Sequence, residues 1–190
     1  MKKKKSIISG LLIAVLLLLV IGCDTGGGGS NPAVTYAIGD TGPSGVGIVF
    51  YVTDGGYGLE AAPSDQSTSQ VWIEGGSTQT TKNGNTSTAI GTGLANSNAI
   101  IDQTGHTGSA AQVCRSYNGG GLTDWYLPSK DELNLLYSQK TAVGGFAEYT
   151  KYWSSSEGST LSAWSQSFSN GFQGYNGKNS TFRVRAVRAF

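Results

Sequence analysis

The chain has 190 residues, which suits one domain, and its 13 Lys and Arg residues nearly balance 12 Asp and Glu. Because four of the lysines lie at positions 2 to 5, the rest of the chain is slightly acidic, which argues against a basic nucleic-acid binder. The 29 glycines and 4 tryptophans argue against disorder and against a helical bundle, and two cysteines with one histidine argue against disulfide scaffolds and Cys/His zinc sites. The composition favours a loop-rich binding domain over an enzyme.

Residues 1–22 have the pattern of a secretion signal. The lysines come first, an apolar run follows over residues 7–21, and Gly22 precedes Cys23. The segment resembles a bacterial lipoprotein signal, which implies cleavage before Cys23 and acylation of its thiol and new amine, so we expect a lipoprotein anchored in a bacterial membrane. A transmembrane anchor is the alternative, but the run is shorter than the ~20 residues that a spanning helix needs.

Residues 23–37 read as the lipidated cysteine and a Gly/Ser linker, and residues 38–190 as the folded domain. We expect the domain to be exposed at the surface of the outer membrane. Asp24 leaves the inner membrane as an alternative, because this residue after the cysteine keeps lipoproteins there in enteric bacteria. With Cys23 acylated, Cys114 has no disulfide partner and is predicted to be buried and unreactive.

Strand patterns open the domain. Residues 47–53 are β-branched and aromatic between glycines, which predicts a strand, and residues 58–62 can be its hairpin partner. Residues 71–74 are a possible third strand. The Ser, Thr, Gly and Asn residues of 66–93 predict a long loop or a small ribbon.

Helix patterns occupy the middle of the chain, over residues 94–103 and 109–117. The clearest helix begins at Ser129, because Glu132 lies three residues further on, as in a capping box, and an apolar stripe follows. Strand patterns then return over residues 152–155, 163–169 and 182–190. The order of strands, helices and strands predicts an α+β domain in which the last strand returns beside the first.

The strand pattern of residues 164–169 predicts a binding surface. Its side chains alternate, so two aromatic residues and a glutamine face one way and three serines face the other. Because a strand normally turns one face to the core and the other to water or a ligand, we expect three small hydroxyl groups on the free face.

Catalytic motifs are absent from the sequence, and no enzyme activity is expected. No phosphate-binding loop is present, no serine lies in a Gly-x-Ser-x-Gly motif, and the lone His106 lies in a glycine-rich loop where an exposed side chain is expected. The acids show no EF-hand spacing, so we expect no cofactor, with a structural calcium ion as the alternative.

No acid follows Glu157 in the sequence, whereas four cations do: Lys178, Arg183, Arg185 and Arg188. One interpretation is a strip that binds an anionic ligand such as a sulfated glycan. The interpretation that we favour pairs these cations with acids elsewhere, and Arg183 and Arg185 share one strand face, as a ladder of ion pairs requires.

Several ordered segments are similar to one family: GDTGPSGVGIVFYV, YGLEAAPSDQST, AIGTGLANSNAII, DWYLPSKDELNLLY, YWSSSE and FRVRAVRAF. They resemble the domain called DUF1566, the C-terminal domain of the Legionella collagen-like protein, over residues 38–190. The resemblance implies a C-type-lectin-like fold with paired N- and C-terminal strands (residues 47–52 beside 183–190), two to three helices, long loops and a ligand site on the later strands. The Glu-Pro-Asn, Gln-Pro-Asp and Trp-Asn-Asp motifs of calcium-dependent lectins are absent, as is the cysteine pair of formylglycine-generating enzymes.

Residues 156–188 are also similar to the variable region of diversity-generating retroelement proteins, in which fixed residues alternate with diversified ones. The resemblance implies scaffold roles for Trp164, Gln166, Phe168, Gly171, Gln173, Lys178 and Arg183. The positions implied to be diversified are Gly158, Ser159, Thr160, Ser162, Ser165, Ser167, Ser169, Phe172, Gly174, Tyr175, Gly177, Ser180 and Thr181.

We therefore predict a lipid-anchored surface module that binds an external protein or glycan and no nucleic acid. Its predicted recognition residues are Ser159, Ser162, Ser165, Ser167, Ser169, Phe172, Gly174, Tyr175, Gly177 and Ser180, with Phe172 and Tyr175 as aromatic anchors. One alternative is a non-diversified adhesin that binds sulfated polysaccharide through Lys178, Arg183, Arg185 and Arg188. The other is a structural envelope lipoprotein without a ligand.

Overall fold

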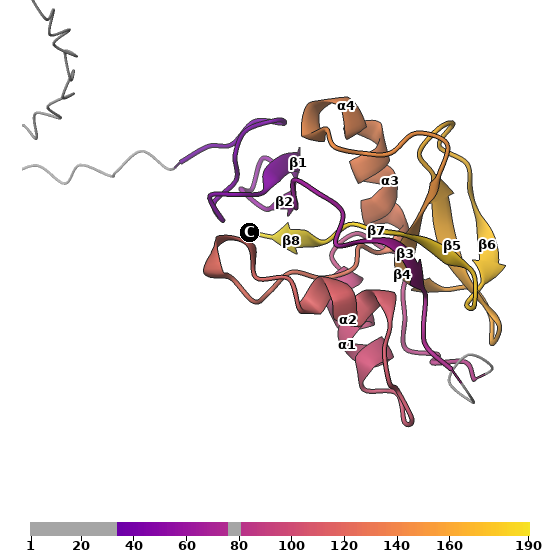
Figure 1. The fold of residues 1–190 in the computed structure, drawn as a ribbon. Coiled ribbons are helices and arrows are strands. Elements are labelled where there is room, and N and C mark those ends of the chain that lie inside the picture. Colours follow the sequence, from indigo (N-terminus) through magenta and orange to yellow (C-terminus); the bar gives the residue numbers. More distant parts are fainter. Residues whose placement is uncertain (1–33, 76–80) are drawn as a thin grey trace, which may run out of the picture. The chain divides into compact units, whose positions relative to one another are not determined.

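Two β-sheets and four α-helices make up the part of the chain that the structure describes (Figure 1). The structure is a computed structural model that describes residues 34–75 and 81–190. The predictions for the leader, for Cys23 and for most of the linker lie outside these residues. The predicted α+β class is confirmed, with four α-helices instead of two to three. None of the described helices is both long enough and apolar enough to cross a membrane.

The first sheet has three strands in the order β1-β2-β8: β1 is Ile48–Val52, β2 is Gly58–Ala61 and β8 is Val187–Ala189. The hairpin of β1 and β2 is confirmed. The expected pairing of the first strand with the last is wrong, because β2 folds back between them and pairs with β8. The other edge of β1 is already occupied, since Gly39 N–H donates to Val49 and Val49 N–H donates to Asp40, both at 2.9 Å.

The second sheet has five strands in the order β3-β7-β4-β5-β6, antiparallel except for the parallel pair β4 and β7. Its strands are β3 (Ser67–Val71), β4 (Lys151–Glu157), β5 (Ser162–Ser167), β6 (Gln173–Gly177) and β7 (Thr181–Val184).

Sequence patterns misjudged three parts of this sheet. Within the segment predicted as a long loop or a small ribbon, Ser67–Val71 forms β3, because an edge strand can carry Ser and Thr side chains in water, and the strand expected at 71–74 is therefore misplaced. The glycine-rich β6 was not predicted, since its order comes from pairing with β5. The single strand expected over 182–190 is two strands in different sheets, β7 and β8.

The helices are α1 (Gly93–Ile101), α2 (Ala110–Arg115), α3 (Lys130–Ser138) and α4 (Lys140–Val143), and a 3-10 turn covers Gly119–Gly121. The predictions of α1, α2 and α3 are confirmed. The capping box of α3 is present, because Ser129 Oγ accepts from Glu132 N–H at 3.2 Å and Ser129 N–H donates to Glu132 Oε2 at 2.7 Å. The short helix α4 was not predicted.

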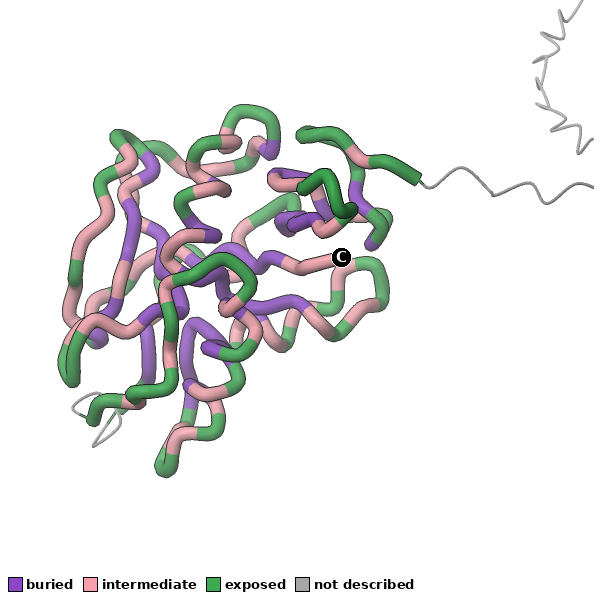
Figure 2. The backbone as a smooth tube through the Cα atoms, turned by 180° about the vertical axis from the view of Figure 1, so that it is seen from behind, coloured by how far each residue is buried: buried purple, intermediate pink, exposed green. Residues whose placement is uncertain are grey.

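Two buried clusters hold the sheets and helices together, and Figure 2 shows the buried segments running through the interior. The first joins Trp72 and Trp153 to side chains of α1 and α2. The second joins Tyr152 and Phe168 to Leu133 and Leu136 of α3. Because neighbouring residues of β4 belong to different clusters, the helices cover both faces of this strand.

Candidate functional site

The hairpin of β5 and β6 carries most of the predicted recognition residues. Trp164 lies opposite Tyr175 and Ser165 opposite Gly174, so the predicted alternation of side chains along β5 is present. We call the side of the hairpin with Trp164, Gln166 and Tyr175 the helix face, because Gln166 Nε2 donates to Asn134 Oδ1 of α3 at 2.9 Å. We call the side with Ser165, Ser167 and Phe172 the open face.

The expectation of three free serines is wrong for Ser165. Its side chain is buried, with 2% exposure, and its hydroxyl accepts from Asn176 Nδ2 at 2.9 Å. Lys151 Nζ in turn donates to Asn176 Oδ1 at 3.0 Å, so side chains from neighbouring strands cover this serine. Ser167 is half-buried and Ser169 exposed, and their hydroxyl oxygens lie 2.8 Å apart, within reach of a ligand.

Phe172 and Tyr175 are exposed, at 67% and 59%, but they lie on opposite faces of the hairpin. The Phe172 ring lies over Gly174 on the open face, where an added Cβ would come within 2.8 Å of it. The Tyr175 ring lies on the helix face against Trp164, with 4.1 Å between ring centroids. The expectation that the two anchors serve one surface is therefore wrong, because three positions along a strand reverse the side.

The other predicted recognition residues lie at the far end of the hairpin from Phe172. Ser159 and Ser162 join their hydroxyls at 2.7 Å in the turn between β4 and β5. Ser180 N–H donates to the Gly177 carbonyl at 2.8 Å in the turn after β6. The predicted set thus occupies both ends and both faces of the hairpin instead of one patch.

The open face is hollowed where β5, β4 and β7 lie side by side. We call this hollow of about 390 Å³ the sheet pocket; it is lined by Tyr149, Thr150, Lys151, Ser167, Ser169, Thr181 and Phe182. Phe182 packs on the buried Trp153 with 4.6 Å between centroids, and Lys151 Nζ lies 5.4 Å from the Phe182 centroid. Its described lining therefore offers an aromatic surface, several hydroxyl groups and one ammonium group, without a carboxylate.

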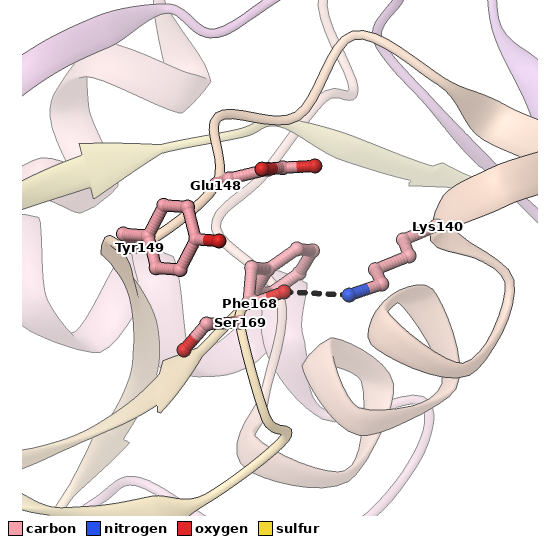
Figure 3. A pocket seen from close by; sticks show the side chains of 5 residues that line it. All are labelled: Lys140, Glu148, Tyr149, Phe168 and Ser169. Atoms are coloured by element: carbon pink, nitrogen blue, oxygen red, sulfur yellow. Dashed lines mark hydrogen bonds between the residues drawn. The ribbon is translucent and has the colours of Figure 1, made fainter.

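A second hollow of about 150 Å³, which we call the α4 pocket, adjoins the first and is lined by Lys140, Glu148, Tyr149, Phe168 and Ser169 (Figure 3). Tyr149 and Ser169 line both pockets. Tyr149 is 88% exposed and has a φ of 56°, in the left-handed region that tyrosine rarely adopts. Strain of this kind is often retained at binding sites.

The four C-terminal cations are paired with acids, as the favoured interpretation had it. Lys178 Nζ lies 2.6 Å from Glu157 Oε1, and both side chains are fully or almost fully buried. Arg183 and Arg185 both contact the Asp65 carboxylate, at 2.8 and 2.7 Å.

Arg188 completes this set, because it contacts Glu60 at 2.8 Å and Asp124 at 2.6 Å. The alternative interpretation is therefore wrong: the side chains of Lys178, Arg183, Arg185 and Arg188 do not form a strip of unpaired cations. In the folded domain these four charges form ion pairs with Asp and Glu residues that lie 21 to 128 positions earlier in the sequence.

Lys140 and Lys151 differ from those cations, since within the described residues neither lies within 4.0 Å of a carboxylate. Lys140 Nζ donates to the Phe168 carbonyl at 2.6 Å and Lys151 Nζ to Asn176. Sequence reasoning missed both lysines, and it also missed Tyr149. The sequence did contain a signal for Lys151. This residue directly precedes the strand pattern of Tyr152–Ser155, and the alternation of side chains along a strand predicts that Lys151 and Trp153 lie on the same side.

The ionisable groups of Cys114, Glu132 and His106, outside the two pockets, have shifted pKa values. Burial raises the pKa of Cys114, which is fully buried, so its sulfur stays a thiol. Burial also raises the pKa of Glu132, which accepts from Ser129 and Gly91 N–H groups. His106 is half-buried instead of exposed; burial lowers its pKa, and its Nε2 lies 2.9 Å from the Ser109 hydroxyl.

Metal-ligating side chains do not gather in the described part of the chain: no three His, Cys, Asp or Glu residues there are placed to hold one ion.

A comparison with protein families bears on this arrangement. The family model described as the Lcl C-terminal domain matches residues 62–188, which include β3 to β7, all four helices and both pockets. No curated protein matches the chain. The matched region covers most of the chain, and the chain belongs to the Lcl C-terminal domain family.

Proposed function

We propose that this chain is a surface ligand-binding module, held at a bacterial membrane through a lipid on Cys23, with its recognition site in the sheet pocket. The single observation that carries the proposal is the lining of that pocket. Phe182 and Tyr149 supply aromatic surface, Ser167 and Ser169 supply hydroxyl groups, and strands β5 and β7 position Ser167 and Phe182. Such a lining suits a ligand with both apolar and hydroxyl-bearing surface, as many glycans and protein loops have.

We propose that the two pockets bind a ligand and do not catalyse a reaction. The hydroxyl of Ser167 bonds to that of Ser169 and not to a base, and His106 bonds to Ser109 away from both pockets. A serine nucleophile needs a base within hydrogen-bonding reach, and the described lining of the two pockets holds no histidine, so their geometry favours recognition; the Ser109–His106 pair lies outside them.

We also infer a C-type-lectin-like fold. The return of the C-terminus supports this inference, because Phe190 exchanges backbone hydrogen bonds of 2.9 and 3.0 Å with Gly58 of β2 and its ring packs on Tyr36, near the start of the domain. An experimental structure with the strands of either sheet in another order would contradict it.

Diversification of residues 156–188 is part of the same proposal. In its support, the scaffold residues Gln166, Phe168 and Lys178 are at most 2% exposed, whereas Phe172 and Tyr175 are the exposed aromatic side chains of the segment. The buried Ser165 departs from the pattern. A near-copy of these codons with adenines at the diversified positions, next to a reverse transcriptase gene, is the expected genomic context.

A substitution that fills the sheet pocket with a large side chain tests whether the ligand binds there. Ser167→Trp places a large ring in the pocket from a half-buried position, and Ser69→Trp on exposed β3 is the matched control. On a printed array of neutral glycans, sulfated glycans and extracellular proteins, we expect S167W to weaken the best interaction at least about tenfold, or ~1.4 kcal/mol, and S69W to leave it unchanged. Equal binding by the two variants would exclude the pocket.

A second candidate is an adhesin for sulfated polysaccharide that binds through Lys140 and Lys151. Lys140 and Lys151 line the two pockets that share Ser169, and within the described residues neither ammonium group lies within 4.0 Å of a carboxylate, although Glu148 also lines the α4 pocket. They replace Lys178 and the three arginines as the cations that an anionic ligand can reach.

A further inference from the structure

We propose that the outer edge of β6 is a separate binding site, which captures an extended peptide segment of a partner protein as an added strand of the five-stranded sheet. The site goes beyond the proposed function, because it is built on the backbone of Gln173 and Tyr175 and shares only Lys151 with the sheet pocket. Added strands are held by main-chain hydrogen bonds, while side chains on the two faces select the sequence.

The register of the hairpin shows which backbone groups are available. Ser167 N–H donates to the Phe172 carbonyl, and Lys178 N–H donates to the Leu161 carbonyl, both at 2.9 Å. Between these bonds the five residue pairs run without a register shift, so alternate residues, Gly174 and Asn176, also bond to β5. Gln173 and Tyr175 therefore direct their N–H and C=O groups away from the sheet.

Two of the other three sheet edges in the described chain are covered. Residues 39–41 bond along β1, and Tyr126 exchanges backbone bonds of 2.8 and 2.9 Å with Val187 of β8. The edge strand β3 has a register shift between Ser67 and Gln70, which interrupts its ladder. Only β6 is regular, uncovered by described residues and free of charge, proline and bulge, the devices that normally block an edge.

The side chains around this edge define the chemistry of the peptide. Phe172 lies on one side of β6 and Tyr175 on the other, so an added strand has an exposed aromatic ring to contact on each face. Lys151 Nζ reaches Asn176 of β6 without a described carboxylate partner. A fitting peptide is extended, places an apolar residue on each face and carries a carboxylate where it passes Lys151.

Two substitutions at one position separate the backbone from the side chain. Tyr175→Ala removes the ring and keeps the outward N–H, whereas Tyr175→Pro removes the ring and also the N–H, without breaking a bond to β5. A display library of random linear peptides is selected on the immobilised full chain, and circular dichroism checks that both variants fold. We expect the selected peptides to be acidic and rich in strand-forming residues, and to bind Y175P at least about tenfold more weakly than Y175A. When bound to the unsubstituted chain, they should also reduce the rate of amide hydrogen exchange at Gln173 and Tyr175.

Each other result overturns the proposal. Equal affinities for Y175P and Y175A, selected peptides that are basic, or no selected peptide would exclude an acidic strand on this edge. Self-association that Y175P abolishes, without peptide selection, would assign the edge to a second copy of the chain. Tyr175→Pro should leave the array binding of the sheet pocket intact, because Tyr175 lies on the helix face, so failure here is distinguishable from failure of the sheet pocket.

Discussion

Asp65 joins side chains that are far apart in the sequence. Its Oδ2 accepts from Tyr152 Oη at 3.0 Å and from Arg183 Nη1 at 2.8 Å, and its Oδ1 accepts from Arg185 Nε at 2.8 Å. Arg185 is 1% exposed, so its charge depends on this carboxylate. Burial, which the nearby Asp65 carboxylate reinforces, raises the pKa of Tyr152 to about 12, so the phenol remains a donor.

Asp65→Asn should therefore destabilise the domain strongly. The substitution leaves the buried Arg185 charge uncompensated, and we expect the free energy of unfolding in urea to fall by about 3–5 kcal/mol. Asp131→Asn is the control, because Asp131 pairs with Lys130 where both side chains are partly in solvent, so the substitution should cost only about 0–1 kcal/mol. Similar losses in the two variants would contradict this role of Asp65.

At the scale of elements, Lys178 holds part of the connection between β3 and α1 against the five-stranded sheet. Its Nζ donates to the Thr81 carbonyl at 3.0 Å and to Glu157 Oε1 at 2.6 Å, and it lies 5.0 Å from the Trp72 ring centroid. Glu157 also accepts the N–H groups of Asn83 and Gly84. One buried ion pair thus holds residues 81–84 against β4 and β6.

Lys178→Met should release this connection. We expect faster amide hydrogen exchange in residues 83–87 and, because Glu157 is left buried and unpaired, a loss of about 3–5 kcal/mol in unfolding free energy. The double variant K178M/E157Q removes the unpaired charge, so it should regain stability while exchange in the connection remains fast. Unchanged exchange in both variants would show that other contacts hold the segment.

Elements with a local cause were predictable from the sequence. The capping residues of α3 and the glycine-bounded β1 hairpin depend on neighbours within a few positions, so their patterns are readable. β6 and β3 were missed because their order comes from pairing with distant strands, which overrides glycine and serine propensities. The site was only partly predictable for the same reason: alternation identified Ser167, whereas only the fold brings Tyr149 and Lys151 beside it.

For the whole molecule, folding redistributes the charge. The sequence divides into an acidic part and a basic C-terminus, but ion pairs neutralise the basic C-terminus, and Lys140 and Lys151 are left beside the pockets. Long-range attraction of a polyanion therefore depends on these two residues more than on the net charge.

Heparin binding tests this second candidate. If a sulfated chain binds here, K140A/K151A should lower its affinity at least about tenfold, and affinity should fall with salt because exposed charges are screened. Lys82→Ala removes an exposed lysine that lines neither pocket, so it should have little effect. Salt-independent binding, or equal losses from both substitutions, would count against the candidate.

Phe190 contacts both Tyr36 and Gly58, so the two ends of the domain lie close together. The rings of Tyr36 and Phe190 lie 5.2 Å apart, and the C-terminus lies on the side of the domain away from β5 and β6 (Figure 1). A short linker can therefore join the two ends, and the exposed turn at Asn179 offers a place to open new ones. Such a circular permutant would preserve both sheets while it moves the point of attachment next to β6.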